Sequence, residues 1–153
     1  MVGAIQQINR WHLASITLFI ILIVFLTGRD YVTHGLLYEY GLLYNPEWVR
    51  IDWWIYFAQL YAAATACAFI AKSWKLLVVY CAFIYSSAQD LVFYAVWMQM
   101  QFPVGDWKWM GNYHLFGTWQ TSHQVLFSFA IVATTCLIMF KSPHWRRQKQ
   151  PYR

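Results

Sequence analysis

LASITLFIILIVFLT, residues 13–27, is an apolar run without a single charged side chain. The apolar segment around it extends from about Trp11 to Gly28, and a helix needs roughly 20 apolar residues to cross the hydrocarbon core of a bilayer. The run is longer than the apolar core of a cleaved signal peptide, about 7–15 residues. No small-x-small cleavage pattern follows it in LTGRDY. We therefore expect a retained transmembrane helix.

Three further apolar segments have the same character, at about 53–71, 76–100 and 122–140. All four prolines and six of the seven glycines lie outside the predicted spans, and Gly28 closes the first of them. Without helix breakers inside, we expect four continuous helices, which argues against a transporter built on broken helices. The sequence predicts an all-α polytopic membrane protein, with residues 1–153 forming a single bundle of four transmembrane helices.

The charged residues predict the orientation of these spans. One side of the membrane would hold the N-terminus, the second-to-third connection and the C-terminus, with the basic residues Arg10, Lys72, Lys75, Lys141, Arg146, Arg147, Lys149 and Arg153 and no acidic one. The other side would hold Arg29, Arg50 and Lys108 among Asp30, Glu39, Glu47, Asp52 and Asp106. Because short cytoplasmic segments carry the excess of Lys and Arg, both termini are predicted to be cytoplasmic. The basic tail would lie on anionic lipid headgroups.

Composition narrows the classes of function. Hydrophobic residues make up 60% of the chain and charged residues 11%, whereas a soluble domain carries about 25% charged residues. The net charge of +5 comes from residues at the ends of apolar runs, so we do not expect nucleic-acid binding. Aromatic residues, at 21%, suit the interfacial belt and bundle packing. The outer loops 29–52 and 101–121 are long enough to fold back against the bundle.

The second span is unusually rich in small residues. Its small side chains are Ala62, Ala63, Ala64, Thr65, Ala66, Cys67, Ala68 and Ala71. Small residues let helices approach closely in lipid, where no hydrophobic force drives them together. We therefore predict that this span is the central helix. The same small face is also suited to a ligand or to another subunit.

Asp90 is the only acidic residue within a predicted span. An ionisable group at that depth is costly unless it is paired or hydrated, which makes it a functional candidate. Two interpretations stay open, an interhelical hydrogen-bond clamp and a ligand or proton site, with a metal ligand as a third. The candidate ligand pocket comprises Asp90, Gln59, Ser86, Ser87, Gln89 and Trp97.

Other groups are candidates for holding a metal. The outer side holds Asp30, His34, His114 and His123, of which the first two have i,i+4 spacing; interfacial polar packing is the alternative. The thiols Cys67, Cys81 and Cys136 are predicted at one depth, where they would form either a soft-metal cluster or ordinary core. Haem is not expected, because no His lies deep in a span. The cofactor is otherwise undetermined, and both a bound lipid and a metal are compatible with the sequence.

Several segments resemble the EXPERA family of four-helix membrane proteins, which includes sterol isomerases and the sigma-2 receptor. These are Asp30 after the first span, YNPEWVRIDWW leading into the second, KSWK after it, IYSSAQD in the third and FKSPHW after the fourth. The resemblance implies a pocket for a hydrophobic ligand near Gln59 and Asp90. Gln59 stands where family members carry an embedded Glu, which argues against isomerase activity.

A second similarity is to small subunits of copper-dependent membrane monooxygenases. It rests on IDWWIY at the start of one span and FPVGDW at the end of another. A metal-bearing subunit of that family would pair Asp with His one helical turn later. Here Tyr94 follows Asp90 at that spacing, and only Asp30 and His34 keep the pattern.

Three hypotheses of function follow. The first, which we favour, is a small accessory or structural subunit of a multi-subunit membrane complex such as a membrane oxidoreductase or monooxygenase. The chain would then be no enzyme on its own, and its partners would be the bilayer and other membrane subunits or further copies of itself. The second is a binder, or an isomerase, of a sterol-like or other small hydrophobic ligand around Asp90. The third is a metal-dependent membrane oxidoreductase subunit.

Overall fold

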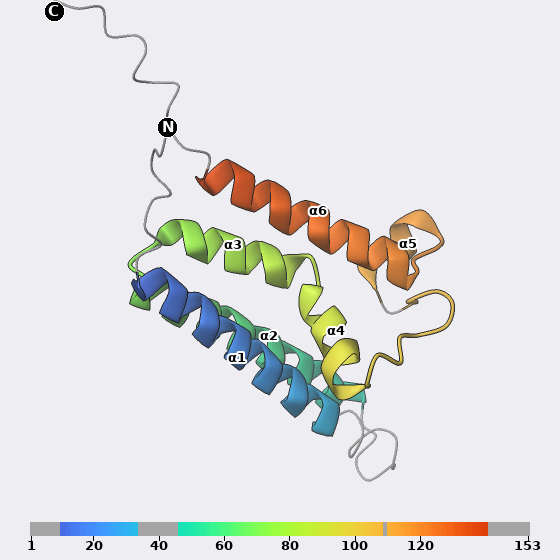
Figure 1. Cartoon of the computed structure of the whole chain (residues 1–153). Helices are drawn as coiled ribbons and strands as arrows, with labels where there is room; N and C mark the ends of the chain where they lie inside the picture. The colour runs from blue at the N-terminus through green and yellow to red at the C-terminus, as the bar shows by residue number, and fades with distance from the viewer. Residues whose placement is uncertain (1–9, 34–45, 109, 141–153) are drawn as a thin grey trace, which may run out of the picture.

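The computed structural model describes residues 10–33, 46–108 and 110–140, and every regular element in this part of the chain is helical, as predicted. Figure 1 shows the elements in order. They are α1 (Arg10–Thr33), α2 (Pro46–Ile70), α3 (Trp74–Tyr85), α4 (Ala88–Val92), the π-helix η2 (Phe93–Trp97), α5 (Gly111–Phe116) and α6 (Thr121–Phe140).

Three helices are long and apolar enough to cross a membrane. They are α1, the segment Arg50–Ile70 of α2, and α6. The pair formed by α3 and the segment Ala88–Trp97 meets the same requirement only when both parts are taken as one span. The helices extend beyond the predicted spans: α1 continues to Thr33, and α2 begins at Pro46, a residue suited to a first helical turn because it lacks an N–H group there.

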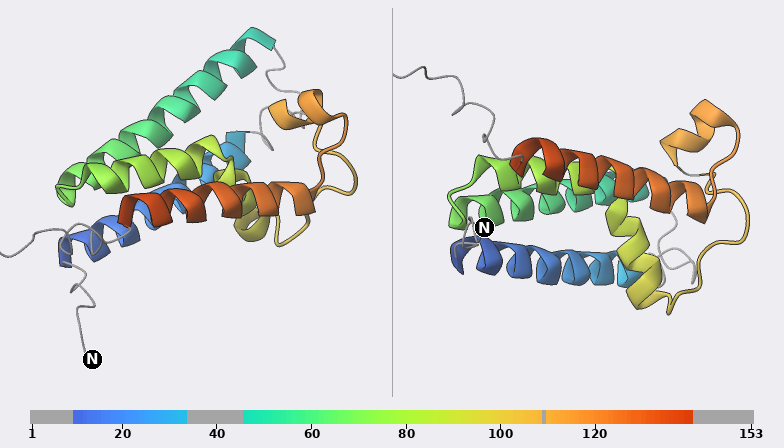
Figure 2. Two further views of the ribbon diagram at one scale, coloured as in Figure 1. Left: turned by 90° about the horizontal axis from the view of Figure 1, so that it is seen from above. Right: turned by 45° about the horizontal axis from the view of Figure 1, so that its top comes forward.

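The helices are arranged as an open row. α1 packs on α2, α2 on α3, and α3 on α6. After α3 the chain turns, so that α4 and η2 cross from the side of α6 to pack against α1 (Figure 2). Within the described residues, α6 packs against α3 and α4 and against no other helix. The ends of the row, α1 and α6, therefore face each other across α3 without touching.

The main core lies among α1, α2 and α3. One face of the small residues of α2 is buried in it, including Ala64, Cys67 and Ala68, whereas Ala62, Thr65 and Ala66 are exposed. Phe19 of α1 stacks on Tyr80 of α3 with ring centroids 4.1 Å apart. The close packing predicted for the second span is thus present, but α2 shares the interior of the row with α3 and is not its single centre.

The third predicted span is not continuous, and the expectation of four unbroken helices is wrong there. α3 ends at Tyr85, and the next helical segment is bent by 68° relative to it. Ser87 has a left-handed backbone, with φ 56°. The break contains neither Pro nor Gly, but the Ser86 hydroxyl donates to the Phe83 carbonyl at 3.0 Å. A serine hydroxyl that bonds a preceding backbone carbonyl in this way competes with the regular hydrogen bonds of the helix and weakens it.

The outer segment 101–120 folds back against the helices, as its length and aromatic content predict. Trp107 is fully buried and Trp119 nearly so. They form a second small core with Met110, against which Leu91 and Tyr94 pack. The Asp106 carboxylate fixes the loop by accepting from the Thr118 hydroxyl at 2.8 Å and from the Trp119 amide at 3.0 Å.

Candidate functional site

The break between α3 and α4 is held by a polar cluster from α6. The Gln124 amide donates to the Ser86 carbonyl at 2.6 Å, and the Ser128 hydroxyl donates to the same oxygen at 2.9 Å. Gln124 and Ser128 also hydrogen-bond each other at 2.9 Å. The Trp119 indole N–H donates to Gln124 Oε1 at 2.8 Å. All of these groups are buried.

This cluster, Ser86 with Gln124, Ser128 and Trp119, compensates for the broken helix. In a continuous α-helix the Ser86 carbonyl would accept from the Asp90 amide. Here the Asp90 amide donates to the Ser87 carbonyl instead, at 3.1 Å. A buried backbone carbonyl without a partner costs free energy comparable to a lost hydrogen bond, and α6 provides the donors that α4 no longer supplies. We call this group the α3–α6 clamp.

Sequence reasoning missed Gln124 and Ser128. A signal was present, since they are polar residues at i and i+4 in a mostly apolar span. An interhelical hydrogen-bond clamp is present in this region of the third span, and the Ser86 carbonyl forms it. The clamp expected through the Asp90 carboxylate stays a prediction.

The structure brings together only part of the predicted ligand pocket. Ser86, Ser87, Gln89 and Asp90 lie in succession at the break. Gln89 is buried, and its Oε1 has no hydrogen-bond partner among the described residues. Gln59 lies on the exposed side of α2.

Trp97, the sixth predicted pocket residue, contacts α1. Its indole N–H donates to the Val24 carbonyl at 3.1 Å and to the Thr27 hydroxyl at 3.2 Å. Gly28 makes this contact possible, because a Cβ built there would lie 2.9 Å from Trp97 Cε2. The role of Trp97 visible in the structure is therefore to join η2 to α1.

Asp90 has charged and phenolic neighbours from other helices. Asp30 of α1 lies within Coulombic range of it, and so do Tyr56 of α2 and Tyr94 of η2. Asp30 is outside the predicted first span, and the extension of α1 to Thr33 carries it into this region. Two neighbouring carboxylates from different helices are able to share a proton.

Arg29 lies next to this acidic group and has a partner of its own. It forms a half-buried ion pair with Asp52, which joins α1 to α2. The charges of Arg29 and Asp52 therefore neutralise each other in the region of Asp30 and Asp90.

The candidate metal ligands lie on separate elements. Asp30 is near the end of α1, His114 is exposed on α5, and His123 is exposed on α6, where its Nδ1 accepts from the backbone N–H of Gln120 at 3.2 Å. His34 lies outside the described residues, so its pairing with Asp30 stays a prediction. In the described ranges, no three His, Cys, Asp or Glu side chains gather as metal ligands.

The soft-metal cluster of thiols is not formed. Cys67, Cys81 and Cys136 are all described, all free, and do not constitute such a ligand group. Cys67 is buried in the main core, and its carbonyl accepts from the Ser15 hydroxyl at 2.6 Å. Cys67 therefore has the other role predicted for these thiols, that of a small residue packed in the core.

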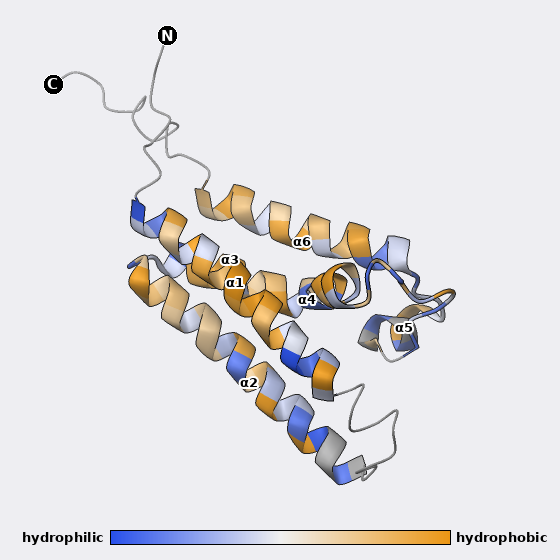
Figure 3. Ribbon diagram, turned by 60° about the horizontal axis from the view of Figure 1, so that its bottom comes forward, coloured by the Kyte–Doolittle hydropathy of each residue, from blue (hydrophilic) through white to orange (hydrophobic). Residues whose placement is uncertain are grey.

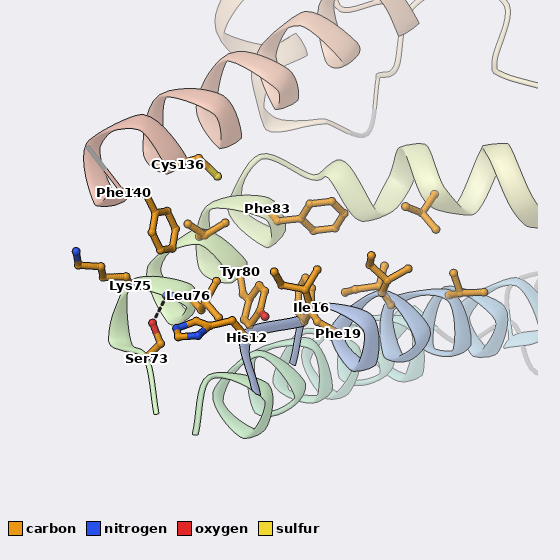
Figure 4. Close-up of a pocket in the computed structure, with 15 residues that line it drawn as sticks. His12, Ile16, Phe19, Ser73, Lys75, Leu76, Tyr80, Phe83, Cys136 and Phe140 are labelled. Atoms are coloured by element: carbon orange, nitrogen blue, oxygen red, sulfur yellow. Dashed lines mark hydrogen bonds between the residues drawn. The ribbon is translucent and has the colours of Figure 1, made fainter. Parts of the chain in front are cut away.

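A cavity of about 850 Å³ lies between α1, α3 and α6. Its walls are mostly apolar, and its polar side chains His12, Ser73 and Lys75 lie at one end (Figure 4). Tyr80 also lines it, with its hydroxyl hydrogen-bonded to Ser15 at 2.8 Å. None of the six residues of the predicted ligand pocket lines this cavity. It occupies the space that opens because α1 and α6 do not pack together.

Comparisons of the chain with models of known families, with characterised proteins and with solved structures find no significant match.

Proposed function

We propose that the chain is inserted in a membrane as four spans, with both termini on the cytoplasmic side. The support is the three long apolar helices, together with the bent pair taken as a fourth span. Arg10 begins α1, and Lys72 and Lys75 lie at the α2–α3 connection. Asp30 lies near the opposite end of α1. This segregation of charge follows the positive-inside rule.

Cysteine labelling tests the orientation. Val104→Cys places a thiol at a fully exposed position of the outer segment, and Arg10→Cys places one at the start of α1. In intact cells, a membrane-impermeant maleimide should label the first variant and reach the second only after permeabilisation. The unsubstituted chain reports the background from its three native thiols. Equal labelling of Arg10→Cys in intact cells would contradict the topology.

Within this topology, the chain acts as a small accessory subunit of a multi-subunit membrane complex, such as a membrane oxidoreductase or monooxygenase. The observation that carries this proposal is the apolar surface of the outer segment. Val104, Leu115 and Phe116 are 104%, 77% and 68% exposed, in a segment that joins η2 to α6 outside the long helices. Lipid tails account for exposed apolar residues on α1 and α6 (Figure 3), whereas exposed apolar side chains beyond these helices favour a protein partner.

Purification in a mild detergent tests the subunit proposal. The tagged chain should elute with partner proteins in fixed stoichiometry. Replacing Leu115 and Phe116 together by Asn should reduce the recovered partner at least tenfold, because it removes the exposed apolar contact. Lys108→Asn, at an exposed polar position of the same segment, should leave recovery unchanged. Elution of the unsubstituted chain alone would refute the proposal.

The second candidate function is binding of a small hydrophobic ligand near Asp90, as the resemblance to the EXPERA family implies. The observation that favours it is the buried Gln89 Oε1 beside Asp90, which has no partner in the part of the chain that the structure describes and would accept a hydrogen bond from a ligand hydroxyl.

A thermal-shift measurement with cholesterol tests this candidate. Cholesterol should raise the melting temperature of the unsubstituted chain, and Asp90→Asn should abolish the shift while leaving assembly intact. Gln59→Ala should retain the shift, because Gln59 lies on the exposed side of α2. An undiminished shift in Asp90→Asn would exclude an Asp90-centred site.

A further inference from the structure

The cavity between α1, α3 and α6 is polar at one end and apolar along its length. His12, Ser73 and Lys75 lie at the polar end. From there the wall follows α1 through Ile16 and Ile20 to Val24. The Tyr80 hydroxyl in the middle is already hydrogen-bonded to Ser15. This distribution matches an elongated amphiphile with a single polar end.

The length of the cavity matches one leaflet of a bilayer. The twelve steps along α1 from His12 to Val24 correspond to about 18 Å at the helical rise. Half of the hydrocarbon core is roughly 15 Å. An acyl chain lying along α1 would therefore span the cavity while its headgroup stays at the level of the helix ends.

The polar end carries positive charge. Lys75 lines the cavity mouth, where its ammonium lies 5.9 Å from the centroid of the Phe140 ring, and Arg10 begins α1 close to His12 in the sequence. Among the described residues, no Asp or Glu lines the cavity. A headgroup that complements this end is anionic, and a phosphate matches the ammonium of Lys75.

We propose that the cavity binds one acyl chain of an anionic phospholipid, with the lipid phosphate against Lys75 and His12. The open gap between α1 and α6 leaves room for the second acyl chain to stay in the bilayer, so the lipid need not leave the membrane to bind. This inference rests on the membrane insertion proposed above and is independent of any protein partner.

Native mass spectrometry of the full chain tests the inference. The chain is reconstituted in nanodiscs with equal amounts of phosphatidylglycerol and phosphatidylcholine of identical acyl chains, and is then released into detergent. One phosphatidylglycerol should remain bound per chain, at least tenfold over phosphatidylcholine. Retention of neither lipid, or of both equally, would overturn the proposal.

Two matched pairs of variants locate the site. Ile20 and Ile21 are equally exposed, at 57%, but only Ile20 lines the cavity. Ile20→Trp should therefore reduce the retained lipid at least tenfold, whereas Ile21→Trp should retain it. Lys75→Gln should remove the preference for phosphatidylglycerol, and Lys108→Gln should leave the preference intact. Equal retention by the two Trp variants would show that the lipid lies elsewhere.

A measurement on the unsubstituted chain tests the same site without depending on the folding of any variant. Phosphatidylglycerol with a photoreactive acyl chain should label Val79 and Phe83, which line the cavity, several-fold more than Phe69 on the exposed side of α2. Uniform labelling would contradict the site. Loss of lipid with the partner retained refutes this inference alone, and loss of the partner with lipid retained refutes the subunit proposal alone.

Discussion

Replacing Gln124 with alanine is expected to lower the free energy of unfolding by about 2–4 kcal/mol, because it removes buried hydrogen bonds and leaves a cavity. The substitution deletes the amide that donates to the Ser86 carbonyl and leaves the Trp119 indole N–H without its acceptor. The α3–α6 clamp is the main polar contact between α6 and the broken span. Unfolding monitored in detergent by circular dichroism measures the loss.

Two comparison variants separate the contributions to this loss. Gln124→Leu keeps most of the side-chain volume but lacks the donors, so it should remain destabilised by the unpaired polar groups. Gln59→Ala removes the same side chain from the exposed side of α2 and should change stability by less than about 0.5 kcal/mol. A Gln124→Ala variant as stable as Gln59→Ala would show that the clamp does not hold α6.

Gly28→Ala is expected to destabilise the chain by about 1–3 kcal/mol, through overpacking against Trp97. The added methyl group would lie 2.9 Å from Trp97 Cε2, closer than carbon atoms approach without strain. The indole cannot move away freely, because its N–H is bonded to the Val24 carbonyl and the Thr27 hydroxyl. The melting temperature in detergent should fall accordingly.

A double-mutant cycle tests whether the loss of stability in Gly28→Ala comes from its contact with Trp97. In a Trp97→Ala background the clash is absent, and alanine is a better helix former than glycine by up to about 1 kcal/mol. Gly28→Ala should therefore be neutral or stabilising in that background and destabilising in the unsubstituted chain. The same loss in both backgrounds would show that the contact between α1 and η2 is not what Gly28 serves.

Features that depend on the composition of a whole segment were predictable from the sequence. The apolar run 13–27, the small residues of α2 and the aromatic outer segment predict the helices, the close packing of α2 and the folded loop, and the structure shows each of them. These features are properties of whole segments, in which length and composition dominate over any single contact.

Features that depend on a partner from elsewhere in the chain were not predictable. Ser86 and Ser87 are tolerated in a helix, and nothing local to them requires a break. The break is stabilised by Gln124, which lies 38 residues away from Ser86. The cavity likewise results from the absence of packing between α1 and α6, which no residue pattern within either helix encodes.

The open row of helices has a consequence for the aperture between its two ends. α6 follows α3, while α4 and η2 rest on α1, so the segment joining these two assemblies passes through Ser86 and Ser87. A rotation about that joint would change the opening only as far as the contact of α2 with α3 and the stacking of Phe19 on Tyr80 allow. The angle at Ser86 and Ser87 therefore sets how the walls of the cavity diverge between Phe83 and Val92, the two lining residues on either side of the break.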